Sequence, residues 1–403
     1  TTNRQSALRR SEVRQLIRQG NVLEGIALAM SKADGVQLRP DWRDSLHLVP
    51  ERSSRQLTQG FVSAALDPKD VMGREPELAA MHAALATKDD TGRQPLVLLH
   101  APPGIGKSAF FQLVEHDINQ RMRDALQRTS AAMQPADAAE GLDVAVAITY
   151  NSNTAPEVTL EEELLLQNTI ALRIAERMMC VDTDPPAFFS FFVDAWCSSP
   201  ALKALKLSSL LADVHKHLAD ALGDRFRRLV VLIDEPIKVC AKGPPCSIMK
   251  RSALVIEATS ECRRGHEWRR TRFAMSSLVL PFDQQDLAQC TVSGGPIKWI
   301  TLPPAGSHER EQVFGFLQEH LGEQCKRMLQ SQQTRRLVEY MLAVSNGRWR
   351  SMREMVRACD EVAATPGLPT DQLAPFMIAV TRTGTPVSDT HTHTHTHTHT
   401  HTH

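Results

Sequence analysis

The sequence predicts an α/β fold, in which a five-stranded parallel sheet is flanked by helices and followed by a small helical domain. Between residues 71 and 305, short apolar runs typical of buried strands alternate with longer segments of helical periodicity. This alternation favours a parallel sheet with helices on both faces. After residue 305 only helical patterns remain. The expected strands cover residues 95–100, 143–149, 229–233, 272–280 and 297–302.

The helical patterns form two groups. The first group separates the expected strands and covers residues 77–86, 106–126, 160–179, a Phe-rich stretch around 188–192, and 201–222. The second group follows the last strand and covers residues 309–321, 334–344, 351–362 and 371–380.

We expect four parts along the chain: a basic, poorly defined lead-in at 1–70, a core at 71–305, a helical domain at 306–381 and a tail at 382–403. The tail alternates His and Thr, as a translated CA-dinucleotide repeat would, and such a tract cannot bury enough apolar surface to fold. Alternating imidazoles could also chelate zinc or nickel, but we favour the disordered repeat. Because the chain begins without Met and ends inside this tract, we expect it to be a fragment.

Composition argues against several classes of protein. Lys plus Arg equals Asp plus Glu at 46 each, so overall charge favours neither a nucleic-acid nor a membrane partner. The eight cysteines include no CxxC pair, a pattern typical of reduced thiols in an intracellular protein and not of a zinc site. No apolar run approaches the ~20 residues that span a bilayer. We therefore expect an intracellular protein of the cytoplasm or nucleus.

A glycine-rich loop, Ala101–Ser108, joins the first expected strand to the next helix. It matches the P-loop pattern G-x-x-x-x-G-K-[ST], except that Ala101 replaces the first Gly. In such a loop, backbone N–H groups turn inward to hold phosphate oxygens, and the following helix adds the positive end of its dipole. We expect Lys107 to act on the β- and γ-phosphates as a catalytic residue, and Ser108 to bind Mg²⁺. The residues expected to bind nucleotide here are Pro103, Gly104, Ile105, Gly106, Lys107, Ser108 and Ala109.

An acidic pair ends the third expected strand. Asp234 is the second expected ligand of Mg²⁺, and the adjacent Glu235 is the expected general base that polarises the attacking water. On the fourth strand, Ser276 is expected to sense the γ-phosphate, although an ordinary strand serine is an equal alternative. Near the start of a C-terminal helix, Arg350 is expected to bind nucleotide phosphate, with Arg348 as its rival.

A dense basic segment at residues 263–272 lies between the third and fourth strands, and a second basic stretch opens the chain. Either could contact nucleic acid, and an arginine of the first could act on a neighbouring subunit's nucleotide. A solvated basic loop is the commoner outcome for such a pattern. The sequence does not single out one arginine that would reach the nucleotide of a neighbouring subunit. It therefore makes no prediction about whether the protein forms oligomers.

Together, Gly73–Glu75, Pro102–Ser108, Leu232–Glu235, Gly347 and Arg350 resemble the AAA+/STAND group of P-loop ATPases over residues 71 to 362. The stretch at 147–152 is similar to the ATPase module of Crinkler effectors and of trypanosomatid retrotransposon hot spot proteins. This resemblance implies a P-loop NTPase fold and ATP as the nucleotide. Ala101 departs from the family pattern, as does Trp349, which stands where related proteins often carry Pro.

The expected function is Mg²⁺-dependent ATP binding and hydrolysis that drives a conformational change in a multidomain protein. One alternative is an ATP/ADP-binding switch with negligible turnover, whose helical part presents a surface to a protein partner. Glu235 favours hydrolysis, because a pure switch does not need a general base. A second alternative is an ATPase that acts on nucleic acid.

Overall fold

The computed structural model describes two compact units, Thr1–Pro303 and Pro304–His403, and each is considered by itself. The residues that the structure describes are 2–31, 36–44, 74–87, 94–102, 104–131, 141–150, 163–180, 199–236, 256–263, 270–277, 297–304, 322–323, 331–345, 349–364 and 374–384.

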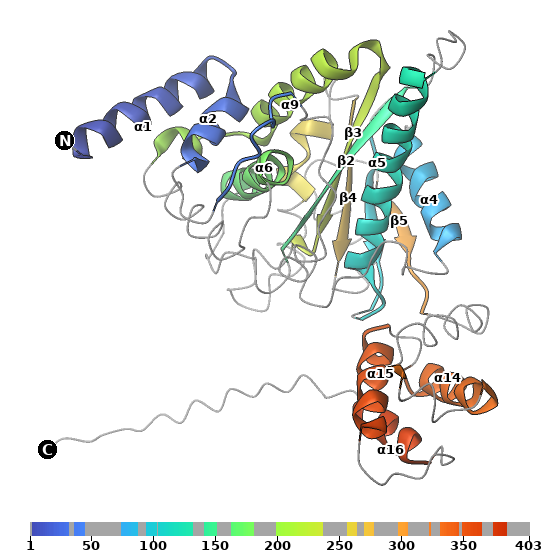
Figure 1. The fold of residues 1–403 in the computed structure, drawn as a ribbon. Helices are drawn as coiled ribbons and strands as arrows, with labels where there is room; N and C mark the ends of the chain where they lie inside the picture. The colour runs from blue at the N-terminus through green and yellow to red at the C-terminus, as the bar shows by residue number, and fades with distance from the viewer. Residues whose placement is uncertain are drawn as a thin grey trace, which may run out of the picture. The chain divides into compact units, whose positions relative to one another are not determined.

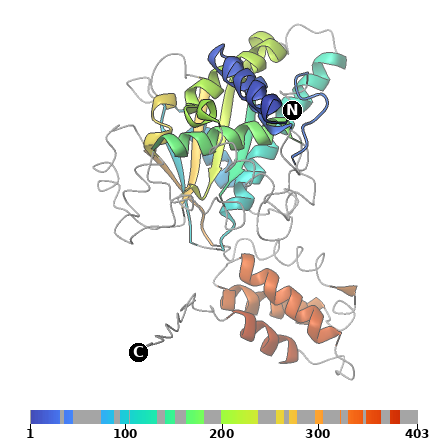
Figure 2. The same cartoon turned by 90° about the vertical axis from the view of Figure 1, so that its left-hand side faces the viewer.

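The first unit is built on a parallel sheet of five strands in the order β2-β3-β4-β1-β5 (Figures 1 and 2). This confirms the predicted sheet. Because β4 and β3 lie between β1 and β2, the chain crosses over two strand positions after β1, and the carboxyl ends of β1, β3 and β4 lie side by side. The strands are β1 (Leu96–His100), β2 (Leu142–Thr149), β3 (Phe226–Asp234), β4 (Thr271–Ser277) and β5 (Ile297–Thr301).

Helices cover both faces of the sheet, because successive strand residues point to opposite faces and both sets are apolar. On one face, Val97, Leu99 and Val230 pack with residues of α4 and α5; on the other, Leu98 and Val231 pack with residues of α6 and α9. Figure 1 shows these two helical layers on either side of the strands. The helices are α4 (Glu75–Ala86), α5 (Lys107–Ala131), α6 (Glu163–Met179), α8 (Pro200–Lys203) and α9 (Leu207–Leu222).

The prediction of one helix over 201–222 is wrong, since α8 ends at Lys203 and α9 begins at Leu207. The side chain of Asn168 on α6 donates to the carbonyls of Lys203, at 3.3 Å, and Leu205, at 2.5 Å. Leu205 is itself buried in the apolar core. These tertiary contacts satisfy carbonyls that a continuous helix would have used.

Two N-terminal helices, α1 (Thr2–Arg18) and α2 (Val22–Met30), belong to the first unit. Most of α2 is buried, and it packs into the apolar cluster formed with α6 and α9. The carboxylate of Asp213 on α9 accepts a hydrogen bond from the Leu23 N–H at 2.8 Å. A tertiary contact thus caps the first turn of α2, whose own N-cap side chain makes no such bond.

The second unit contains α14 (Ser331–Ser345), α15 (Trp349–Ala363) and α16 (Ala374–Gly384). These helices confirm the patterns predicted for 334–344, 351–362 and 371–380. Their buried apolar side chains include Leu337, Met341, Met355, Cys359, Phe376 and Val380. The helices predicted at 188–192 and 309–321 lie outside the described residues. No described helix combines the length and apolar character needed to cross a bilayer.

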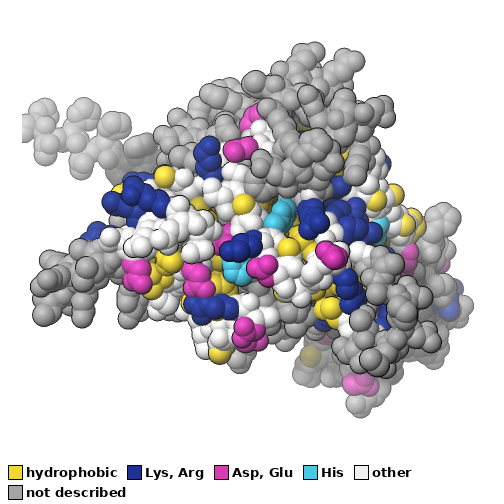
Figure 3. Space-filling model, turned by 90° about the horizontal axis from the view of Figure 1, so that it is seen from above, with side chains coloured by type: hydrophobic (Ala, Val, Ile, Leu, Met, Phe, Trp, Pro, Cys, Tyr) yellow, Lys and Arg dark blue, Asp and Glu magenta, His cyan; other side chains and the backbone are white. Residues whose placement is uncertain are grey.

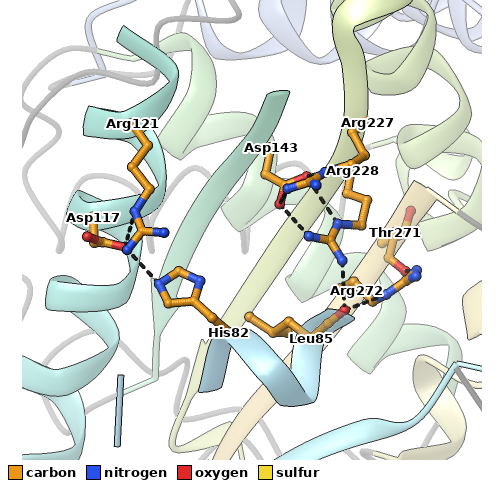
Figure 4. A network of polar contacts seen from close by, with 9 residues as sticks. All are labelled: His82, Leu85, Asp117, Arg121, Asp143, Arg227, Arg228, Thr271 and Arg272. Atoms are coloured by element: carbon orange, nitrogen blue, oxygen red, sulfur yellow. Dashed lines mark hydrogen bonds and ion pairs between the residues drawn. The ribbon is translucent and has the colours of Figure 1, made fainter. Parts of the chain in front are cut away.

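At the amino ends of the strands, a network of arginines around Asp143 ties three strands to α4 (Figure 4). Asp143 on β2 accepts hydrogen bonds from both Arg227 and Arg228 on β3. Arg228 and Arg272 also donate to the Leu85 carbonyl near the end of α4, at 3.1 and 2.9 Å. Burial alone would raise the pKa of Asp143, but the bonds and charges of Arg227 and Arg228 hold that pKa below its ordinary value.

The outer edge of β2 is paired with side chains of α5. Asn119 donates to the Ala145 carbonyl at 2.9 Å and accepts from the Ala145 N–H at 2.8 Å. Glu115 accepts from the Ala147 N–H at 2.8 Å. These bonds satisfy backbone groups on a sheet edge, where unpaired groups invite association with another strand.

We predict that Asn119→Ala lowers the free energy of unfolding by about 2–4 kcal/mol, because it leaves a buried N–H and a buried carbonyl of Ala145 unpaired. Urea unfolding of the two proteins measures the difference. Gln120→Ala, on the next residue of α5, is the control and should change stability by less than about 0.5 kcal/mol. Equal effects of the two substitutions would contradict this role for Asn119.

Candidate functional site

The predicted P-loop lies between β1 and α5, at the carboxyl edge of the sheet. Gly104 and Gly106 have φ angles of 84° and 101°, in the left-handed region that favours glycine. Ala101 is fully buried, and its φ is not positive. The departure from the glycine pattern at this position therefore imposes no backbone strain. Pro103 lies outside the described residues.

Lys107 begins α5 and folds back over the loop. Its Nζ donates to the carbonyl of Ala101 at 2.7 Å and to that of Pro102 at 3.2 Å. The side chain is only 5% exposed. Its charge also acts on His100, the last residue of β1: burial, and then the charge of Lys107, lower the pKa of His100 below its ordinary value.

Asp234, at the end of β3, is fully buried and accepts hydrogen bonds from hydroxyl groups of three other elements. Ser108 on α5 and Thr149 on β2 donate to its Oδ2, at 2.7 and 3.0 Å. Ser276 on β4 donates to its Oδ1 at 2.6 Å. The structure thus brings together Ser108 and Asp234, the two expected ligands of Mg²⁺, and places Ser276 against the same carboxylate.

Glu235 follows directly and has a φ of 51°, the one positive φ of a non-glycine residue in the described parts of the chain. Its N–H donates to Ser276 Oγ at 2.9 Å, and its side chain is buried. Ser276 therefore joins the carboxylate of Asp234 to the backbone of Glu235. Strain of this kind persists where surrounding contacts impose it, and it clusters at functional sites.

Thr149 is the site residue that the sequence analysis missed. It was the last residue of the expected strand at 143–149 and was given no chemical role. In the sheet it is paired in register with Asp234. A polar residue at the end of a strand that neighbours the acidic strand is the signal that could have identified it.

The oxygens gathered around Asp234 suit a magnesium ion. Mg²⁺ is usually held by one or two carboxylates together with phosphate oxygens and water, and Asp234 and Ser108 supply a carboxylate and a hydroxyl 2.7 Å apart. No group of three or more His, Cys, Asp or Glu side chains suited to a metal occurs among the described residues.

Other candidates lie elsewhere or outside the described side chains. Arg350 is on α15 in the second unit, and its side chain is not described, so its contact with phosphate stays a prediction. In the basic segment 263–272, Arg263 is buried and donates to the Ile256 carbonyl at 3.4 Å. Arg270 lies over the Phe226 ring, and Arg272 belongs to the buried network at the amino ends of the strands.

Residues 70–235 match the family of the AAA ATPase domain. Among solved structures, the chain is similar to the Orc1 protein of Aeropyrum pernix in complex with DNA, at 13% identity and a TM-score of 0.41, covering 81% of this chain and 68% of that one. It is also similar to C. elegans PCH-2, at 12% identity and a TM-score of 0.38, covering 77% and 66%. The search among curated proteins found no match.

The strained backbone at Glu235 should reverse the usual order of stability between an Ala and a Gly substitution. In ordinary backbone, Gly is less stable than Ala by about 0.5–1 kcal/mol, whereas a left-handed φ costs a residue with a Cβ roughly 1–2 kcal/mol. We predict that Glu235→Gly is more stable than Glu235→Ala by about 1 kcal/mol in urea unfolding.

The same pair of substitutions at Glu12, an exposed position in α1, serves as the control and should give the ordinary order, with Ala more stable. If Gly is also the less stable residue at position 235, the backbone there is not strained.

Proposed function

We propose that this protein binds ATP with Mg²⁺ and hydrolyses it. The observation that carries the proposal is the convergence on Asp234 of hydroxyls from Ser108, Thr149 and Ser276, beside a P-loop with Gly104 and Gly106 in left-handed conformations. The match of residues 70–235 to the AAA ATPase domain supports ATP as the nucleotide.

The loop from Gly104 to Ala109 would hold the phosphates through its backbone N–H groups, at the positive end of α5. Lys107 donates to two loop carbonyls. We propose that its ammonium exchanges at least one of these carbonyls for β- and γ-phosphate oxygens, which restores the hydrogen bonds and adds charge pairing. Burial strengthens this pairing, because water screens it less.

Asp234 and Ser108 would hold Mg²⁺, which when bound neutralises charge on the phosphates and orients them. Ser108 can turn its hydroxyl toward a metal while Thr149 and Ser276 keep their bonds to the Asp234 carboxylate. We expected Ser276 to sense the γ-phosphate directly. Its two observed bonds support a different role, in which it positions Asp234 and the backbone of Glu235.

Glu235 is proposed as the general base. Its backbone is held by Ser276, and its side chain is buried. A carboxylate held in this way can polarise a water molecule for attack on the γ-phosphate. Coupling of hydrolysis to a conformational change of the helical unit, with Arg350 taking part, is a further element of this proposal.

Two arginines of the basic segment 263–272 are not available to contact nucleic acid. Arg263 and Arg272 are buried, and each donates to backbone carbonyls. On the face of the molecule seen in Figure 3, described Lys and Arg side chains are interspersed with Asp and Glu, and they form no single-sign surface. Binding that is dominated by phosphate contacts requires a surface of one sign.

The proposal predicts release of phosphate from ATP by the wild-type protein with Mg²⁺. Lys107→Ala should abolish it, and Glu235→Gln should lower it about 10²- to 10⁴-fold while ATP binding is retained, because only the general base is lost. Lys298→Ala removes an exposed lysine of β5 and is the control expected to keep full turnover.

Phosphate release by Glu235→Gln at the wild-type rate would remove Glu235 from its proposed role. If the wild type binds ATP and releases no phosphate, the protein is instead a nucleotide-binding switch.

A further inference from the structure

Arg74 precedes α4 and connects two segments that are distant in sequence. Its side chain is 4% exposed. Nη1 donates to the carbonyl of Pro303 at 2.9 Å, and Nη2 donates to the carbonyl of Ile105 in the P-loop at 3.4 Å. Glu77, one turn further along α4, lies 3.8 Å from Nη1. One guanidinium therefore spans the P-loop and the last residue of the first unit.

The segment that leaves β5 runs beside the start of the P-loop. The N–H of Leu302 donates to the carbonyl of His100 at 2.9 Å, so strand pairing continues to the residue before Pro303. Leu302 is buried in the same apolar cluster as Ala101 and Ile105. Pro303 ends the first unit, and the chain enters the second unit at residue 304.

This arrangement makes the Arg74 guanidinium sensitive to the shape of the loop. A planar guanidinium holds its N–H donors in a fixed fork, so two carbonyls bound by it have a fixed spacing. When a P-loop binds phosphate, its N–H groups must point at the phosphate oxygens. Any rotation of the peptide that carries the Ile105 carbonyl then changes its bond to Arg74. Leaving an N–H group of a buried guanidinium without its partner costs free energy. We therefore expect the guanidinium to shift, and its bond to the Pro303 carbonyl to change with it.

We propose that Arg74 is a positioning residue that couples the P-loop to the segment at Leu302–Pro303, so that phosphate bound in the loop alters the point where the chain leaves the first unit. The proposal rests on the nucleotide binding proposed above. It assigns a role to Arg74, the central residue of the sequence motif at 73–75, which the site itself did not use.

Hydrogen exchange of the full chain, with and without ADP and Mg²⁺, tests this coupling. The two peptides to compare cover residues 101–110, which contain the loop, and residues 297–304, which contain the Leu302 N–H. In the wild type, we expect ADP to slow exchange in the loop peptide and to change it in the second peptide, with the same midpoint of ADP concentration.

Arg74→Lys should retain the slowed exchange of the loop peptide and lose the response at 297–304, because one ammonium cannot reproduce the fork. A merely structural role would leave this nucleotide response intact. Arg39→Lys is the matched control, since Arg39 is also buried and donates to a backbone carbonyl, that of Met178. It should retain both responses.

Three results would overturn the proposal. The first is an Arg74→Lys protein with both wild-type responses. The second is a wild-type protein in which the loop peptide responds to ADP and the peptide at 297–304 does not. This result overturns the coupling even if the variant fails to fold. The third is a wild-type protein in which exchange of the loop peptide does not change with ADP. Only this third result would also overturn the proposed nucleotide binding, so it can be distinguished from the other two.

Discussion

The candidate site depends on one constraint, which is that the carboxylate of Asp234 is completely buried at the end of β3. A carboxyl group removed from water requires hydrogen-bond partners, or it destabilises the fold. Here the partners are hydroxyls from α5, β2 and β4. Strands β2 and β4 belong to the parallel sheet and α5 packs against it. The pairing of Thr149 with Asp234 is part of the sheet register. The contacts that fold the sheet are therefore the contacts that assemble the site.

Different kinds of side chain hold the elements together at the two ends of the strands. At their amino ends, the network around Asp143 fixes β2, β3 and β4 relative to α4 through arginine side chains. At their carboxyl ends, short hydroxyl side chains surround Asp234 and leave its neighbour Glu235 in a strained backbone conformation. Rigid arginine contacts suit a structural end of the sheet, whereas a hydroxyl can rotate to accept a new partner, as binding of a metal requires.

The sequence was sufficient for the sheet and for the place of the glycine-rich loop between β1 and α5, because both leave local patterns. Five apolar runs predicted the strands, and the spacing of Gly104, Gly106, Lys107 and Ser108 predicted the loop. Thr149 was missed because its role exists only once β2 lies beside β3. The break near Leu205, the cap of α2 and the bridge made by Arg74 likewise depend on contacts between residues far apart in sequence. The position of Ser276 was recognised, but its bonds to both Asp234 and Glu235 were not predictable from a strand pattern.

We propose that Asp234 and its hydroxyl partners form the metal end of a nucleotide site. The most direct measurement is the affinity for ADP, by titration calorimetry, with and without Mg²⁺, in the wild type and in Asp234→Asn. We predict that Mg²⁺ strengthens ADP binding to the wild type, and that Asp234→Asn still binds ADP without metal but no longer responds to Mg²⁺. An equal response to Mg²⁺ in the two proteins would contradict the claim.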